Sequence, residues 1–176
     1  MSKTKRIAFV GVLAAVYFAL SYLVVDTGSL KFTFTSLAIL VTALLFTPLE
    51  ACAVALVGEF FYQVVIFGVT ATTPIWLLPP VIHGLSLGLC AWLFRRKGKP
   101  LENRPVLCVA LCMGCAVLNT VCNTTALYAD SKIFGYYEYH MVFGVALIRA
   151  GVGLATALAV SLVAIPLVRG IRKHGF

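Results

Sequence analysis

The chain has 176 residues, of which 61% are hydrophobic and only 11% charged, and its mean hydropathy is +1.01. Soluble domains carry about 25% charged residues, so a soluble globular fold is excluded, and the continuous apolar runs exclude the alternating pattern of a membrane β-barrel. The net charge of +8 does not indicate nucleic-acid binding, because most basic residues flank the apolar runs. We expect one all-α integral membrane domain over residues 1–176.

The first two apolar segments predict two membrane-spanning helices. The segment Ile7–Val25 follows basic residues, as in a signal peptide, but no small-x-small cleavage site follows it. It is long enough to cross a bilayer, which takes roughly 20 residues, so we expect a retained helix. A short polar turn at 26–31 leads into the second predicted helix, Phe32–Phe46.

The third predicted helix begins with a clear start signal and contains an unusual acidic residue. Thr47 fits the N-cap, Pro48 the first helical position and Glu50 the third, as in a capping box. The helix is expected to end near Phe67. Glu50 therefore has a structural role, whereas Glu59 lies deep in the apolar run without one.

A proline-broken apolar segment at 68–80 follows this helix. Residues before proline avoid the helical region, and irregular backbone at membrane depth requires burial in protein or a cavity to line. We therefore predict an irregular lid or re-entrant loop at 68–80. The fourth helix is then short, Pro80–Phe94, and a basic loop at 95–104 follows it.

The last two predicted helices are Pro105–Leu127 and Met141–Val168, joined by a tyrosine-rich loop at 128–140. All six cysteines lie in apolar runs, and no histidine or carboxylate is interleaved with them. We expect neither a disulfide framework nor a metal site, and interpret the cysteines as small residues that let helices pack closely.

The six predicted spans place both termini on one side of the membrane. The N-terminus, the 95–104 loop and the C-terminus hold 11 of the 14 basic residues. Because cytoplasmic segments carry the excess of lysine and arginine, we expect a six-transmembrane-helix bundle with both termini cytoplasmic. The tyrosine-rich loop and the lid are expected outside.

Polar residues within the predicted spans gather at one depth, toward the outer side. Glu59 is the costliest, because an intramembrane carboxylate usually faces a cavity or a partner. Three further helices or their adjoining lid carry polar or aromatic residues at this depth, which indicates a small-molecule site inside the bundle. Its predicted members are Glu59, Tyr62, Gln63, Trp76, His83, Asn119, Asn123 and Arg149.

Structural explanations of these residues stay open. Glu59 and Arg149 could form a buried ion pair. The asparagines could hydrogen-bond between helices, His83 could be a core histidine, and the aromatic residues could form an interfacial belt. A small intramembrane enzyme or a scaffold is also an alternative, although no G-x-S-x-G or H-E-x-x-H motif marks a reaction and no Walker A motif marks an ATPase.

The chain resembles the substrate-binding (S) components of energy-coupling factor (ECF) vitamin transporters over nearly its whole length. The small-residue stripe Gly11-x-x-x-Ala15-x-x-x-Ala19 is similar to the stripe that contacts the membrane coupling subunit in that family. The segment Leu30–Leu40 and the turn before Pro48 are similar to folate-family S components. Residues 72–84 look like the corresponding region of the same group, but differ from the F-P-G-F-T-type loop of folate binders.

This resemblance implies a transport subunit of the bacterial plasma membrane rather than an enzyme. The chain would bind no cofactor of its own, while a membrane coupling subunit and two cytoplasmic ATPases would use ATP to release its cargo inside. Small-residue stripes also serve packing within a bundle, and that alternative stays open for helix 1.

The predicted site residues favour a heteroaromatic cargo, with folate preferred and queuine or another vitamin as alternatives. A carboxylate can accept two hydrogen bonds from a 2-amino-pyrimidinone edge, which suits Glu59 to a pterin or a deazaguanine. Trp76 and tyrosines would stack on the ring. Arg149, Lys31 or His83 would hold the glutamyl carboxylate of folate.

Overall fold

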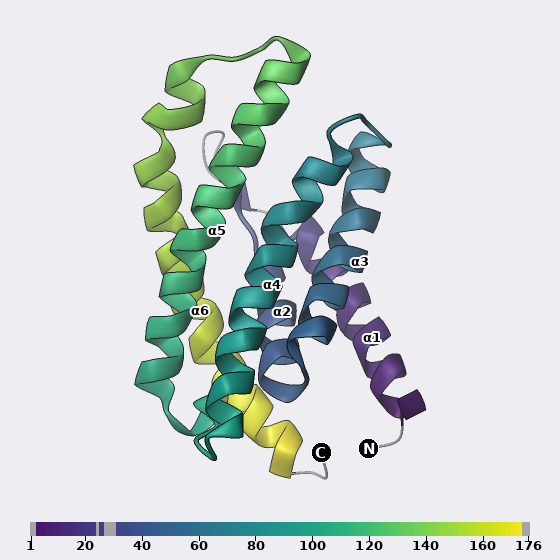
Figure 1. Ribbon diagram of the computed structural model, residues 1–176, viewed down its shortest axis with the longest axis vertical. Coiled ribbons are helices and arrows are strands. Elements are labelled where there is room, and N and C mark those ends of the chain that lie inside the picture. The colour runs from purple at the N-terminus through teal and green to yellow at the C-terminus, as the bar shows by residue number, and fades with distance from the viewer. Residues whose placement is uncertain (1–2, 24, 27–30, 174–176) are drawn as a thin grey trace.

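The structure, a computed structural model, describes residues 3–23, 25–26 and 31–173. In this part of the chain, six α-helices and one short hairpin form a single bundle (Figure 1). The helices are α1 (Lys3–Tyr22), α2 (Thr35–Leu45), α3 (Pro48–Phe67), α4 (Thr73–Arg96), α5 (Pro105–Phe134) and α6 (Ala146–Lys173). The strands β1 (Val25–Asp26) and β2 (Lys31–Phe32) pair antiparallel between α1 and α2.

The all-helical membrane fold is confirmed in outline, but a sixth span is not. Within the described residues, five helical segments are long and apolar enough to cross a membrane. The helix α2 has only 11 residues, or about 16 Å at 1.5 Å per residue, against a hydrocarbon thickness of about 30 Å. The predicted second helix was too long at its start, because Lys31 and Phe32 belong to β2.

The bundle has two chemically different ends. The start of α1, the α4–α5 turn and the end of α6 lie together at the bottom of Figure 1. This end, which we call the basic end, carries the clustered lysines and arginines. The α3–α4 and α5–α6 connections lie at the opposite end, which we call the tyrosine end. The side of the membrane that each end faces stays a prediction.

The start of α3 is confirmed as predicted. Thr47 and Glu50 form the capping box, and the backbone N–H of Thr47 donates to Oε2 of Glu50 at 2.8 Å. The Glu50 carboxylate also pairs with the guanidinium of Arg6. Glu50 therefore joins α1 to α3 in addition to capping its own helix.

The predicted lid at 68–80 is wrong for most of its length. Residues 73–80 form the first two turns of α4, which leaves only Gly68–Thr72 outside the helices. Pro74 lies in the first turn, where no N–H is needed. Pro79 and Pro80 lie inside the helix, and membrane helices tolerate such prolines because neighbouring groups satisfy the freed carbonyls. His83 consequently lies near the middle of α4 and not in its first turn.

Two arginines bind the C-terminal end of α2. The Arg95 guanidinium, from the end of α4, donates to four consecutive carbonyls at distances of 2.6–3.2 Å. Arg172 of α6 donates to one of them at 2.9 Å and also pairs with Oε1 of buried Glu102 at 2.7 Å. The last carbonyls of a helix have no partner within it, so these cations satisfy them. The acceptors of Arg95 are the carbonyls of Ala43, Leu44, Leu45 and Phe46.

A close helix contact joins α3 and α4 through two glycines. A Cβ atom on Gly88 would lie 2.6 Å from Cα of Pro48, and one on Gly84 would lie 2.9 Å from the carbonyl oxygen of Ala51. Real Cβ atoms do not approach backbone this closely, so these positions require glycine. Small residues are the usual means of close helix approach in membranes.

We predict that Gly88→Ala lowers the free energy of unfolding by about 1–2 kcal/mol, because overpacking forces the two helices apart. The measurement is the unfolding midpoint of the purified protein in detergent. Gly114→Ala is the matched control, because Gly114 lies in α5 with no atom near its Cβ position, and alanine favours helix. Equal midpoints for Gly88→Ala and the unmodified chain would contradict the close α3–α4 contact.

Candidate functional site

Glu59 of α3 is held by two neighbouring side chains. The Tyr17 hydroxyl of α1 donates to Oε2 at 2.8 Å, and Nε2 of Gln63 donates to Oε1 at 2.8 Å. Tyr17 and Gln63 are both buried, whereas Glu59 is half-buried. The predicted placement of Glu59 and Gln63 on one helical face is confirmed. The carboxylate is thus hydrogen-bonded on both oxygens while part of its surface stays accessible.

Tyr17 is a member of this group that sequence reasoning missed. Its ring packs where Gly58 has no side chain, since a Cβ on Gly58 would lie 2.4 Å from Cδ1 of Tyr17. A glycine directly before Glu59 was the only sequence signal for this contact.

We predict that Tyr17→Phe lowers the free energy of unfolding by about 1 kcal/mol, because it removes the hydroxyl donor and leaves one Glu59 oxygen without its partner. Thermal unfolding in detergent measures the change. Tyr22→Phe is the control, because Tyr22 lies at the end of the same helix and is 49% exposed. If both variants unfold at the same temperature as the unmodified chain, the Tyr17–Glu59 hydrogen bond contributes nothing to stability.

A second polar group lies where α4 meets α5. Nδ1 of His83 lies 3.3 Å from the carbonyl oxygen of Cys115, and the His83 side chain is buried. Asn119 is one turn beyond Cys115 on the same face of α5, and Asn123 is one turn further. Among the described residues, Oδ1 of Asn119 is buried and accepts no hydrogen bond. A buried acceptor without a donor costs about 1–3 kcal/mol, so this atom is the place where a ligand donor would be most favourable.

A third polar group surrounds Asp130 at the tyrosine end. The Tyr136 hydroxyl donates to Oδ2 of Asp130, and Thr72 and Trp76 lie near this carboxylate. Burial and the contact with Asp130 raise the pKa of Tyr136 to about 12, which keeps its hydroxyl protonated as a donor. Asp130 was missed because α5 was predicted to end at Leu127, which placed it in a loop.

Arg149 binds backbone carbonyls just before α6. Its Nη2 donates to the carbonyl oxygens of Met141 at 2.6 Å and Val142 at 3.0 Å, in the π-helical turn His140–Gly144 that precedes α6. The proposed ion pair between Glu59 and Arg149 is therefore not formed. Tyr62 packs its ring against Tyr22, with ring centroids 6.2 Å apart.

The predicted site residues thus form separate groups rather than one network. Glu59, Gln63 and Tyr62 lie on α3, where Glu59 and Tyr62 contact α1. His83 lies on α4 and the asparagines lie on α5. In the part of the chain that the structure describes, no hydrogen bond joins Glu59 to Asn119 or to Arg149. Glu59, His83 and Asn123 each lie in the half of their helix that is nearer the tyrosine end.

The small-residue stripe of α1 is accessible. Gly11, Ala15 and Ala19 are all exposed, and no atom lies within 4 Å of the Cβ position of Gly11. Packing within the bundle therefore does not explain the stripe in this chain. The exposed face is available for a second helix.

Comparisons with known proteins agree with this architecture. The model of a family described as "ECF-type riboflavin transporter, S component" matches residues 1–173. A solved structure described as "Structure and mechanism of the S component of a bacterial ECF transporter" superposes with a TM-score of 0.68 at 18% identity, covering 98% of both chains. At this identity the superposition shows the fold alone. No curated protein matches the sequence significantly.

Proposed function

The chain belongs to the family of ECF-type riboflavin transporter S components, and from that premise we propose that its cargo is riboflavin, bound in the half of the bundle nearer the tyrosine end. S components are the substrate-binding subunits of importers and not enzymes. The family match over nearly the whole chain is the observation that carries this proposal. It replaces folate, which the sequence had favoured, as the first candidate.

The polar groups of the site support a flavin ring. The pyrimidine edge of riboflavin alternates carbonyl, N–H and carbonyl groups, and a side-chain amide offers both a donor and an acceptor. Asn119 supplies the acceptor, because its buried Oδ1 has no donor among the described residues. We assign Asn119 to the ring N–H and Asn123 to a neighbouring ring carbonyl or ribityl hydroxyl.

Folate is the second candidate, and Glu59 is the observation that favours it. Each Glu59 oxygen accepts one hydrogen bond, but an ionised carboxylate has about four acceptor sites. The remaining sites match the two donors on the edge of a pterin, or equally of queuine. The two candidates therefore differ in their main acceptor. A flavin would bind chiefly to Asn119, and a pterin chiefly to Glu59.

The remaining transporter roles are also part of this proposal. The exposed stripe Gly11, Ala15 and Ala19 offers a close-approach surface to a membrane coupling subunit. Two ATPases bound to that subunit would supply the energy, so the chain itself needs no nucleotide. The basic end would face the cytoplasm of a bacterial cell, with the tyrosine end outside.

Identification of the ligand that co-purifies with the chain tests the proposal. The protein is expressed in cells grown with both vitamins, extracted in mild detergent and analysed by mass spectrometry after denaturation. We expect riboflavin at about one molecule per chain. Folate in its place would support the second candidate, and a preparation that neither retains nor rebinds either vitamin would contradict both.

A further inference from the structure

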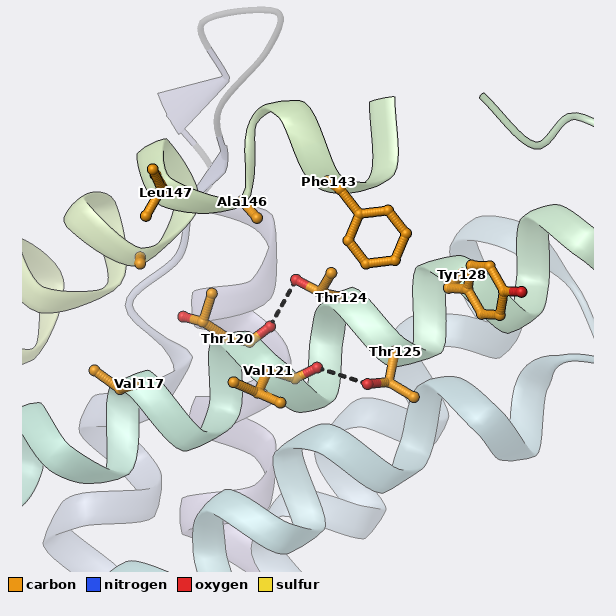
Figure 2. A pocket seen from close by; sticks show the side chains of 10 residues that line it. Val117, Thr120, Val121, Thr124, Thr125, Tyr128, Phe143, Ala146 and Leu147 are labelled. Atoms are coloured by element: carbon orange, nitrogen blue, oxygen red, sulfur yellow. Dashed lines mark hydrogen bonds between the residues drawn. The ribbon is translucent and has the colours of Figure 1, made fainter. Parts of the chain in front are cut away.

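An apolar groove runs between α5 and α6 on the opposite side of α5 from the asparagines (Figure 2). Its volume is about 330 Å³. None of the residues predicted for the cargo site lines it. The lining side chains are Val117, Thr120, Val121, Thr124, Thr125, Tyr128, Phe143, Ala146, Leu147 and Ala150.

The three threonines of the groove do not make it polar. Each hydroxyl donates to the carbonyl one turn earlier in α5 at 2.9 Å, and two of these bonds are drawn in Figure 2. The donors are therefore satisfied within the helix. A vitamin that needs several hydrogen bonds gains little here, whereas an aliphatic chain fits the lining.

The two ends of the groove differ. Toward the basic end the helices close, because Gly153 of α6 approaches Thr120, whose Oγ1 would lie 3.2 Å from a Cβ at that position. Toward the tyrosine end the groove reaches Tyr128, and Nζ of the exposed Lys132 lies 5.7 Å from the Tyr128 ring centroid and 3.9 Å from that of Tyr137. A closed apolar end and a cationic, aromatic end give the groove a direction.

We propose that this groove binds one acyl chain of an anionic phospholipid, whose phosphate contacts Lys132. Tyrosines gather at the level of lipid headgroups, so Tyr128 and Tyr137 place the ammonium at phosphate depth. Among the described residues, no ion pair joins Lys132 to Asp130 or Glu138, and Asp130 accepts from Tyr136 instead.

Native mass spectrometry of the full chain tests this site. The protein is released from nanodiscs that contain equal amounts of phosphatidylglycerol and phosphatidylcholine of the same chain length. We expect one retained phosphatidylglycerol per chain. Ala150→Phe fills the groove and should reduce retention of that lipid about tenfold, whereas Leu162→Phe, at a 62% exposed position of α6 outside the groove, should not.

Two further variants separate the parts of the proposal. Lys132→Gln should lower the preference for phosphatidylglycerol about fivefold, as expected for one cation near the membrane surface, while Lys97→Gln at the basic end leaves it unchanged. Thr124→Val keeps the shape of the groove and should retain the lipid. Equal retention in Ala150→Phe and Leu162→Phe would overturn the acyl-chain site, and equal retention of both lipids would overturn the role of Lys132. A dimer of the chain that Ala150→Phe abolishes would assign the groove to a second copy instead.

Discussion

Arg95→Ala is expected to lower the free energy of unfolding by about 3 kcal/mol or more. The guanidinium of Arg95 donates to four consecutive carbonyls at the end of α2, and a hydrogen bond to a charged group contributes about 1.5–3 kcal/mol. A helix of 11 residues is too short to be stable by itself, so α2 depends on these contacts and on its packing. The unfolding midpoint in detergent, followed by circular dichroism, measures the loss.

Two variants control for charge and for general surface effects. Arg95→Lys keeps the charge but loses the planar guanidinium. Its unfolding midpoint should therefore lie between those of Arg95→Ala and the unmodified chain. Arg96→Ala removes a neighbouring arginine that stacks on Trp92 at 4.2 Å and should stay near the original midpoint. If Arg95→Ala and Arg96→Ala shift the midpoint equally, the arginine does not cap α2.

Asn119→Leu is expected to weaken cargo binding about 30- to 100-fold, equivalent to roughly 2–3 kcal/mol. The substitution removes the buried acceptor that we assign to the ring N–H and leaves that donor without a partner in the complex. Because leucine is close in size, the helix contacts are retained. Titration of the purified variant with riboflavin measures the loss.

Thr125→Val is the matched control for this effect. Thr125 lies on the opposite, exposed face of α5, and its hydroxyl bonds only to the carbonyl of Val121. The affinity of Thr125→Val for riboflavin should equal that of the unmodified chain. Should Asn119→Leu bind riboflavin unchanged while Glu59→Gln loses binding, the flavin assignment would give way to recognition through the carboxylate.

The membrane class and most helix positions could be predicted because they depend on local composition. Long apolar runs predict the spans, the Thr47–Glu50 capping box predicts the start of α3, and the basic clusters predict which ends of the helices lie together. The start of α4 could not be predicted, because the preference of residues before Pro79 and Pro80 for extended backbone is local, whereas the packing that overrides it is not. The second helix was predicted but too long, because nothing in the sequence between Phe32 and Thr35 marks where β2 ends and α2 begins.

The sequence pointed to individual candidate residues, but it could not show which of them contact each other. Glu59 and Gln63 are one turn apart, so their pairing follows from helical geometry. Tyr17 joins them from a helix 42 positions away in the chain, which no spacing rule indicates. Arg149 carries a charge that suggested a partner acid, yet its guanidinium satisfies backbone carbonyls, and only coordinates distinguish the two.

Riboflavin binding is tested most directly by calorimetric titration of the purified chain alone, in detergent and without ATP or partner subunits. We predict that riboflavin binds one site per chain with a dissociation constant below about 1 µM, a binding free energy of about −8 kcal/mol or more favourable, and that folate does not compete at similar concentration. A chain that binds no flavin, or that binds folate in preference, would contradict this prediction.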